Sequence, residues 1–372
     1  MKYYIIAGEA SGDLHGSNLI NEIIKIDSKA EIRGWGGDKM EKSGAEIVKH
    51  YRDLAFMGIY EVLINIRSIL KNIKFCKDDI LKFNPDKIIF IDYPGFNLRI
   101  AKWAKSKNNN FKTYYYVAPQ IWAWNESRIH EIKKNIDHLY VILPFEKYFF
   151  ENKHNYKVKY FGHPLLDSIT HLKNNEKEKF IKKNNLDIKK PIIAILPGSR
   201  EQEIKKILSV MLDVIDDFND YQFVIAAAPS INTEFLNRII DNKNIKIIKN
   251  KTYEVLSLSK AAIVTSGTAT LETAILKVPQ VVCYKSSFLT YFLAKIFVKI
   301  KFISLVNLIM NKEIVKELIQ NNCTKEEIIK ELKNVLDLSK RKVLKQSYDE
   351  LIGKLGSSGS SKRVANDIIL NK

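Results

Sequence analysis

The sequence predicts an α/β protein of two Rossmann-like, doubly wound domains, and three observations lead to this fold class. Short apolar runs rich in Ile, Val, Tyr and Phe alternate with helical patterns, as in parallel sheets covered on both faces. These runs form two sets, separated by the charged stretch His171–Lys190. A chain of 372 residues, 46% of them hydrophobic, is long enough for two such cores.

Each domain has its own set of predicted strands. The first-domain strands are Lys2–Gly8, Glu31–Gly36, Asp86–Asp92, Lys112–Ala118, Leu139–Leu143 and Val158–Phe161. The second-domain strands are Pro191–Leu196, Tyr221–Ala228, Ile245–Ile248, Ala261–Thr265 and Gln280–Tyr284. Because doubly wound sheets bind ligands at the carboxyl ends of their strands, two facing domains predict a central cleft.

The domain bounds follow from this pattern. We expect a first domain over residues 1–170, a charged linker over 171–190 and a second domain over 191–355. A solvated helix is an equal alternative for the linker stretch. The Gly- and Ser-rich segment that begins at Gly356 predicts a hinge, followed by a final helix, Lys362–Leu370. The segment 356–372 is expected to pack on the first domain or on a second subunit.

Composition narrows the class of protein. The net charge of +18 fits an anionic partner, whether nucleic acid, phosphorylated substrate or acidic membrane, and equally fits a lysine-rich composition. The three cysteines form no CxxC pair, so we expect no disulfide framework or zinc site, and a reducing cytosol. The longest uncharged runs, Thr113–Asn125 and Tyr221–Thr233, are shorter than the roughly 20 residues that span a bilayer. Neither a membrane span nor a signal peptide is expected.

Two loops of the first domain carry candidate chemistry. The loop Gly8–Gly16 is not a GxGxxG motif, which disfavours a nicotinamide site and suits a polyhydroxy ligand or a plain tight turn. Asp92 ends the third strand, where a carboxylate acts as a general base for a sugar hydroxyl or caps the helix that Pro94 opens. The aromatic run Tyr114–Trp124 is either core packing or an apolar wall for a sugar face or acyl chain.

Two loops of the second domain predict a nucleotide-diphosphate site. Pro197–Glu203 joins a strand, a small-residue turn and Arg200 to a helix start, an arrangement that binds phosphate. It lacks the GK[ST] ending of an ATP-binding loop. Ser266, Gly267 and Thr268 open a second helix, and Glu272 one turn later can accept bonds from ribose hydroxyls.

These loops, in this order, resemble the lipid-A-disaccharide synthase family. The matching motifs span most of the chain, which makes chance agreement implausible. They are GEASGD at Gly8–Asp13, MGIYEVL at Met57–Leu63, IDYPGFN at Ile91–Asn97, APQIWAW at Ala118–Trp124, LPFEK at Leu143–Lys147, FGHPLLD at Phe161–Asp167, LPGSR at Leu196–Arg200, TSGTATLE at Thr265–Glu272 and SLVNLIM at Ser304–Met310.

The resemblance implies the GT-B fold and an inverting transfer. The donor would be UDP-diacylglucosamine, the acceptor diacylglucosamine 1-phosphate (lipid X), and the product a β(1→6) disaccharide with release of UDP. No cofactor and no metal are expected. The enzyme would be cytoplasmic and peripherally bound to the inner membrane, with no nucleic-acid partner, and a homodimer stays open. Another UDP-sugar enzyme of the same fold, including a 2-epimerase, is the alternative.

The resemblance also assigns roles to residues. The expected catalytic residues are Asp92, Asp13 and Arg200. The expected donor-site residues are Gly198, Ser199, Arg200, Ser266, Gly267, Thr268, Glu272 and Asn307. The expected acceptor-site residues are Glu9, Ser11 and His15, although a histidine at this position is not a fixed feature of the family. Two basic, aromatic-rich segments, Leu54–Phe75 and Ser286–Ile303, are expected to touch the membrane or to be ordinary core helices.

Overall fold

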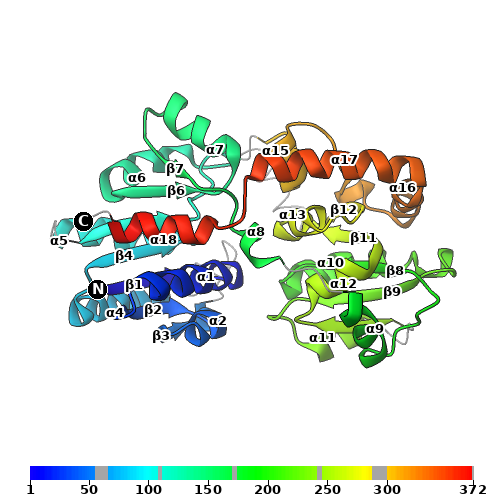
Figure 1. Cartoon of the computed structure of the whole chain (residues 1–372), viewed down its shortest axis with the longest axis horizontal. Coiled ribbons are helices and arrows are strands. Elements are labelled where there is room, and N and C mark those ends of the chain that lie inside the picture. Colours follow the sequence, from blue (N-terminus) through cyan, green and yellow to red (C-terminus); the bar gives the residue numbers. More distant parts are fainter. Residues whose placement is uncertain (55–65, 108–110, 170–173, 241–244, 287–299, 371–372) are drawn as a thin grey trace. The chain divides into compact units, whose positions relative to one another are not determined.

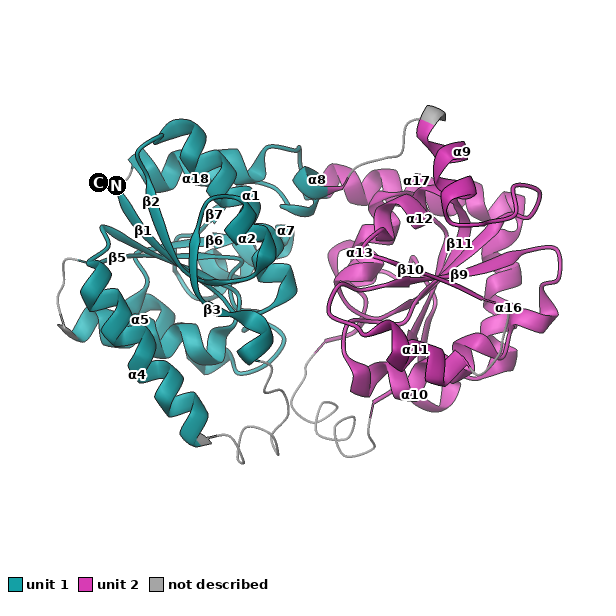
Figure 2. Ribbon diagram, turned by 90° about the horizontal axis from the view of Figure 1, so that it is seen from below, with its two compact units in different colours: residues 1–168, 355–372 teal, residues 169–354 magenta. Residues whose placement is uncertain are grey.

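The chain folds into two compact units. The computed structural model describes residues 1–54, 66–107, 111–169, 174–240, 245–286 and 300–370. Unit 1 comprises Met1–Ser168 and Leu355–Lys372, and unit 2 comprises Ile169–Lys354 (Figure 2). Each unit has a parallel sheet flanked by helices (Figure 1), which confirms the predicted class of two doubly wound α/β domains.

The unit 1 sheet has seven strands in the order β3-β2-β1-β4-β5-β6-β7. Their bounds are Glu46–His50 (β3), Glu31–Gly36 (β2), Lys2–Ala7 (β1), Lys87–Ile91 (β4), Lys112–Tyr116 (β5), His138–Val141 (β6) and Lys159–Tyr160 (β7). All six predicted strands are present. The sequence analysis missed β3, an edge strand without a single fully buried residue and therefore without a continuous apolar run.

Helices cover both faces of this sheet. They are α1 (Ala10–Ile26), α2 (Asp38–Lys42), α4 (Ile66–Phe83), α5 (Pro94–Lys107), α6 (Ile129–Asn135), α7 (Pro144–Tyr148), α8 (Leu165–Ser168) and α18 (Ser360–Leu370). Side chains alternate across the strands. Tyr4, Ile6, Ile88 and Phe90 face one way and form a core with α4 and α5.

The last helix, α18, returns to unit 1 and packs beside α1. Asp367 accepts hydrogen bonds from the Tyr140 hydroxyl and Lys159 Nζ, both at 2.7 Å. Lys87 Nζ donates to the carbonyl oxygen of Ile368 near the carboxyl end of the helix, and Asp167 accepts from the Ser361 amide at its start, at 2.8 Å. Of the two packing partners open for this segment, the structure shows the first domain.

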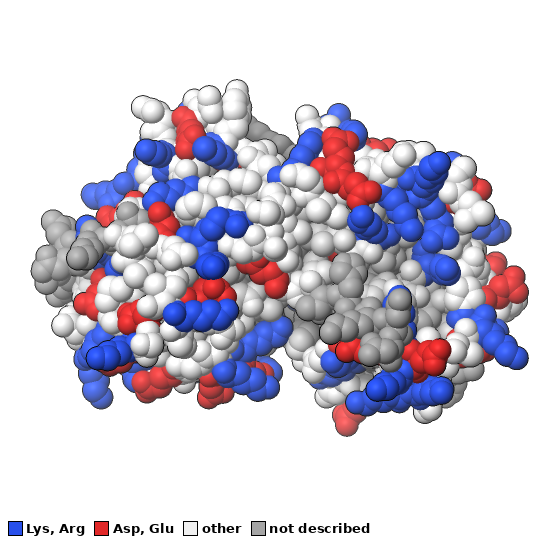
Figure 3. Space-filling model, in the orientation of Figure 1, with Lys and Arg blue, Asp and Glu red and all other residues white. Residues whose placement is uncertain are grey.

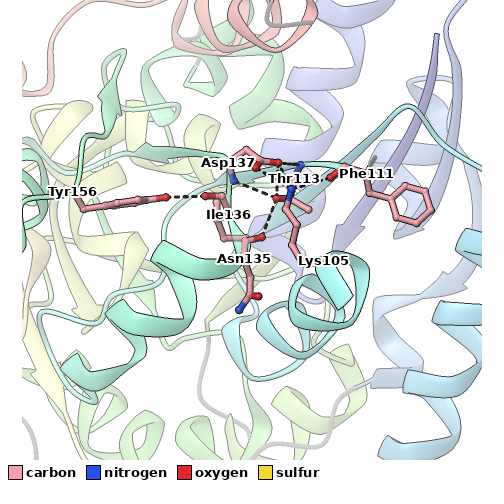
Figure 4. Close-up of polar contacts among 7 residues, drawn as sticks. All are labelled: Lys105, Phe111, Thr113, Asn135, Ile136, Asp137 and Tyr156. Carbon is pink, nitrogen blue, oxygen red and sulfur yellow. Dashed lines mark hydrogen bonds and ion pairs between the residues drawn. The ribbon is translucent and has the colours of Figure 1, made fainter. Parts of the chain in front are cut away.

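A polar network closes the amino edge of the unit 1 sheet (Figure 4). Asp137 accepts from Lys105 Nζ at 2.6 Å and from the Thr113 amide at 2.8 Å, and Thr113 Oγ1 donates to the Asn135 carbonyl at 2.9 Å. Burial acts to raise the pKa of Asp137, but Lys105 and the hydrogen bonds outweigh it and hold the pKa below its usual value. This edge is therefore occupied by structural contacts.

The unit 2 sheet has six strands in the order β10-β9-β8-β11-β12-β13. Their bounds are Lys246–Lys249 (β10), Gln222–Ala227 (β9), Ile192–Leu196 (β8), Ser259–Thr265 (β11), Gln280–Tyr284 (β12) and Glu317–Ile319 (β13). The five predicted strands are confirmed. The sixth, β13, has three residues and was too short to predict.

Helices also cover both faces of the unit 2 sheet. They are α9 (Asn174–Lys183), α10 (Glu201–Leu212), α11 (Thr233–Ile240), α12 (Thr252–Leu258), α13 (Thr268–Ile275), α15 (Leu305–Met310), α16 (Lys325–Leu336) and α17 (Leu338–Leu355). One core lies under α10, α11 and α16, and the other under α12. The charged stretch thus contains a helix, α9, whose Phe180 and Ile181 pack on the second core.

Candidate active site

Asp92 lies in a sharp turn directly after β4, at the carboxyl edge of the unit 1 sheet. Asp92 and Tyr93 have φ angles of 45° and 50°, a left-handed backbone that costs a non-glycine residue roughly 1–2 kcal/mol. Asn97 Nδ2 and the Tyr115 hydroxyl donate to the Asp92 carbonyl oxygen at 2.7 and 2.6 Å. The Asp92 residue is half-buried. Two side-chain donors thus hold the backbone of this strained turn, which fixes the position from which the Asp92 side chain extends.

The loop after β1 meets the Asp92 turn, because β1 and β4 pair in parallel. The Tyr93 ring lies over Gly8, where a Cβ would be 2.4 Å from the ring, so this position requires glycine. The next residue, Glu9, precedes α1 as its N-cap and is half-buried, as is Ser11. Burial raises the pKa of Tyr93, and the charge of Glu9 raises it further. The structure therefore brings the Glu9 loop and the Asp92 turn together.

Asp13 has a structural position. It is 3% exposed, and its carboxylate accepts from the amides of Gly37 at 2.8 Å, Met40 at 3.0 Å and Lys39 at 3.1 Å. These amides belong to the start of α2, where backbone N–H groups lack partners within the helix. The carboxylate thus joins α1 to the start of α2 next to the end of β2, and its expected catalytic role stays a prediction.

His15 is also buried, at 4% exposure. Burial lowers its pKa to about 4, although Asp167 raises it, so the ring is neutral near pH 7. A neighbouring histidine, His163, is equally buried, and burial lowers its pKa to about 3. This position does not support the expected acceptor contact for His15.

Glu146 is a fully buried carboxyl near the Asp92 turn that the sequence analysis did not single out. It accepts from Trp122 Nε1 at 2.9 Å and from the amides of Ile142 and Leu143 at 3.0 and 2.8 Å. Burial and, to a smaller extent, the charge of Asp92 outweigh these hydrogen bonds and raise the pKa of Glu146 to about 7. Glu146 thus anchors the aromatic loop after β5 to the end of β6. The LPFEK motif was the available signal.

In unit 2, Arg200 precedes α10 as its N-cap, at the carboxyl edge of the sheet. Its side chain is 50% exposed and pairs with Glu203 at 3.0 Å. Gly198 has a φ of 107°, which favours glycine. The Ser199 carbonyl accepts from Ser230 Oγ at 3.0 Å, which joins this loop to the one after β9. The predicted loop geometry of a strand, a glycine turn, an arginine and a helix is present.

The second predicted loop of unit 2 lies beside the first, because β8 and β11 are paired. A Cβ on Gly198 would be 3.6 Å from Thr265 Cγ2, at the end of β11. Gly267 has a φ of 149° and leaves open space where a side chain would be. Gly267 and Thr268 are exposed at the start of α13. Ser266 differs: it is half-buried, and its hydroxyl donates to the Ile303 carbonyl at 2.9 Å.

Two expected donor residues are held by other side chains or by backbone. The Tyr253 hydroxyl donates to Glu272 Oε1 at 2.8 Å. Asn307 is fully buried, and its amide makes four bonds: Oδ1 accepts from the amides of Ile314 and Val315, and Nδ2 donates to the Val315 carbonyl and to Glu317 Oε1. These four bonds give the Asn307 amide a structural role, and its expected donor contact stays a prediction. Glu272 stays a candidate.

Two polar edges result, one in each unit. In unit 1 the edge holds Glu9, Ser11 and Asp92. In unit 2 it holds Gly198 to Arg200 and Gly267 to Thr268. Within the described parts of the chain, no group of three His, Cys, Asp or Glu residues lies close enough to hold a metal ion.

Solved structures with the same architecture show the fold class. A glycosyltransferase from Rickettsia africae ESF-5 matches with a TM-score of 0.57 at 14% identity, over 100% of this chain and 99% of that one. The UDP-GlcNAc 2-epimerase from Neisseria meningitidis, bound to UDP-GlcNAc, matches with a TM-score of 0.61 at 13% identity, over 100% of both chains. At this identity the likeness establishes the GT-B fold alone.

Sequence relatives establish the family. The chain is 38% identical over 357 residues to the lipid-A-disaccharide synthase of Coxiella burnetii (strain CbuK_Q154), covering 95% of this chain and 92% of the relative. It is 37% identical over 336 residues to lipid-A-disaccharide synthase 1 of Legionella pneumophila (strain Paris), covering 89% and 86%. The family description "Lipid-A-disaccharide synthetase" matches residues 3–367. With its fold and both polar edges inside that match, the chain belongs to the lipid-A-disaccharide synthetase family.

Proposed function

We propose that the protein transfers diacylglucosamine from UDP-diacylglucosamine to the 6-hydroxyl of lipid X, giving a β(1→6) disaccharide 1-phosphate and UDP. Family membership supports the class of reaction. The observation that carries the proposal is the Asp92 turn, a strained backbone that places a half-buried aspartate at the carboxyl edge of the unit 1 sheet. Two consecutive residues with left-handed backbone cost conformational energy, and such strain is typical of functional sites.

The proposed mechanism is a single displacement at the anomeric carbon of the donor. The acceptor 6-hydroxyl forms the new C1–O bond as the C1–O bond to UDP breaks, so the configuration inverts through an oxocarbenium-like transition state. Asp92 takes the hydroxyl proton as general base. Arg200 and the backbone amides at the start of α13 stabilise the negative charge that develops on the departing diphosphate.

Both substrates carry acyl chains, and we propose that α4 contacts the cytoplasmic leaflet of the inner membrane. Its outer face exposes Leu70 at 58%, Phe75 at 44% and Leu81 at 51% beside the exposed Lys71 and Lys74. Apolar and basic side chains on one helix face are typical of interfacial helices. On the face drawn in Figure 3, Lys and Arg are interspersed with acidic residues and form no unbroken basic surface.

No described helix is long and apolar enough to cross a membrane. Of the two segments expected at the membrane, residues 55–65 and 287–299 lie outside the described part of the chain. Co-sedimentation with anionic vesicles tests α4. Leu70→Glu with Phe75→Glu is expected to release the protein into the supernatant, and unchanged sedimentation would refute the assignment.

An assay in detergent micelles with both substrates tests the reaction. We expect disaccharide and UDP only when donor and acceptor are both present, whereas a 2-epimerase would convert its UDP-sugar without an acceptor. Asp92→Asn should lower kcat at least about 100-fold, the scale of general-base loss, and the exposed Asp220→Asn serves as control. Near-normal turnover of Asp92→Asn would remove Asp92 from the role.

Calorimetry tests the donor site. Arg200→Ala should weaken UDP binding about 10-fold or more, because a charge-assisted bond to phosphate is lost. Binding of the acceptor should stay unchanged. Arg238→Ala, at another exposed arginine of unit 2, is the matched control. Weaker acceptor binding with intact UDP binding would contradict the assignment.

A further inference from the structure

A cavity beside the Asp92 turn has basic side chains that the mechanism above does not use. It has a volume of about 320 Å³ and is lined by the start of α5, at Pro94 and Gly95, and by the loop that leads into α6. Arg99 and Arg128 line it from two different elements. Within the described chain, neither guanidinium has a carboxylate oxygen within the 4.0 Å of an ion pair.

The remaining polar groups of the cavity also suit an anion. Ser127 Oγ donates to Asn125 Oδ1 at 2.9 Å. This bond engages the amide oxygen, so the NH₂ group of Asn125 is the part of the side chain that can donate to an anion. Asn125 has a left-handed backbone, with a φ of 56°, at the start of the short helix that carries Ser127 and Arg128. One carboxylate, Glu131, lines the cavity as well and opposes an anion there.

Trp124 adds an apolar surface next to the cavity. Its side chain is 51% exposed, and the Arg128 guanidinium lies 4.9 Å from its ring centroid. An aromatic ring can pack on the apolar face of a sugar. The cation–π contact with Trp124 holds the Arg128 guanidinium in place, where it can also bind an anionic group. Guanidinium groups bind phosphate with two parallel hydrogen bonds, which gives both charge and orientation.

The cavity is linked to the proposed general base. Pro94 and Gly95, which line the cavity, come two and three residues after Asp92 in the chain. The Tyr115 hydroxyl donates to the Asp92 carbonyl oxygen at 2.6 Å. Arg128 is among the charged groups that act on Tyr115, whose pKa is raised chiefly by burial. The cavity therefore adjoins the turn that carries Asp92, although the Asp92 side chain is not part of its lining.

We propose that Arg99 and Arg128 bind the phosphate monoester of the acceptor, with Trp124 against its sugar ring. This subsite rests on the proposed function and adds to it a determinant of acceptor choice. C1, which carries the phosphate, and C5, which carries the 6-hydroxymethyl group, both flank the ring oxygen. Holding the 1-phosphate in the cavity therefore restricts where the 6-hydroxyl can lie relative to the Asp92 turn. The subsite selects a phosphorylated acceptor over the same lipid without phosphate.

The test compares two acceptors, lipid X and its dephosphorylated form, in neutral detergent micelles. For lipid X, Arg128→Ala and Arg99→Ala should each raise KM about 10- to 100-fold, the range for losing a charge-assisted bond, with kcat little changed. Arg128→Lys should give an intermediate KM, because it keeps the charge and loses the paired geometry. For the dephosphorylated acceptor, all three variants should match the wild type.

Two further variants sharpen the test. Glu131→Gln should lower KM for lipid X about two- to fivefold, because an opposing surface charge is removed. Lys102→Ala, an exposed cation on α5 outside the cavity lining, should change nothing. Equal losses with both acceptors would overturn the proposal in favour of a structural role for the arginines.

Two binding measurements separate the remaining explanations. Equilibrium dialysis with glucosamine 1-phosphate and with glucosamine should show arginine-dependent binding of the first alone. If glucosamine 1-phosphate binds in an arginine-dependent way but no sugar is transferred, the proposed function is refuted and the phosphate subsite is supported. If sugar is transferred but this binding does not depend on the arginines, the subsite is refuted and the proposed function is supported. If Arg99→Ala and Arg128→Ala weaken binding to anionic phospholipid vesicles that contain no acceptor, the cavity serves lipid headgroups and the proposal is wrong.

Discussion

Replacing Asp13 distinguishes a structural carboxylate from a catalytic one. Its two carboxylate oxygens accept hydrogen bonds from three backbone amides, those of Gly37, Lys39 and Met40. In Asp13→Ala these donors lose a charged partner at a largely buried helix start. Each unsatisfied amide costs about 1–3 kcal/mol, and partial relaxation makes about 3–5 kcal/mol the expected total loss of unfolding free energy. In Asp13→Asn, Oδ1 can keep the bonds from Gly37 and Met40, so about 1–3 kcal/mol is expected.

The assay exploits the distribution of tryptophan. All four tryptophans, Trp35, Trp103, Trp122 and Trp124, belong to unit 1. Urea unfolding followed by tryptophan fluorescence therefore reports the stability of unit 1. A loss of stability lowers the urea concentration at the unfolding midpoint and leaves the dependence of the unfolding free energy on urea unchanged. In parallel, kcat per folded molecule should fall less than about fivefold for Asp13→Asn, against at least about 100-fold for Asp92→Asn.

The opposite pattern would refute the reasoning. If Asp13→Asn unfolds at the wild-type urea concentration and loses about 100-fold in kcat, its carboxylate acts on the substrate and the structural assignment fails.

Three further predictions concern Glu146, Asn307 and Gly8. The pKa of Glu146 is raised from 4.5 to about 7, so its contribution is complete below pH 4.5 and is lost as pH rises through about 7. The difference of about 2.5 pH units, at about 1.36 kcal/mol each, predicts that unit 1 loses about 3 kcal/mol across this range. Urea titrations at several pH values should show a flatter profile for Glu146→Gln, and identical slopes would contradict the assignment. Asn307→Ala should lower unit 2 stability by about 3–4 kcal/mol and keep the thermal stabilisation by UDP, measured by circular dichroism; an unchanged Tm with no UDP effect would restore the donor contact. Gly8→Ala should destabilise unit 1 by about 1–3 kcal/mol through its clash with Tyr93, and Gly8→Ala with Tyr93→Ala should recover part of the loss in the same fluorescence assay.

The sequence predicts the strands whose burial leaves an apolar run. Buried strands such as β4 are continuous runs of large apolar residues, whereas β3 is half-exposed and β13 has three residues. The fold class depends on the buried strands and is therefore predicted correctly.

Site residues are harder to predict, because a motif gives the position of a residue and not the direction of its side chain. Asp13 and Asn307 lie in motifs that resemble the family, yet both side chains turn inward to backbone amides. Arg99 and Arg128 come from separate elements, so no local pattern could place them in one cavity. The role of Asp92 stays a prediction.

The return of α18 to unit 1 has a consequence for synthesis on the ribosome. Unit 2 is one uninterrupted stretch of chain, whereas unit 1 needs residues 355–372, which are made after unit 2, to cover α1 and to partner Lys87. Domains of nascent chains generally fold in order from the amino terminus. Here unit 2 is complete before unit 1, although its residues are made later, and unit 1 keeps one face of α1 uncovered until α18 has been made.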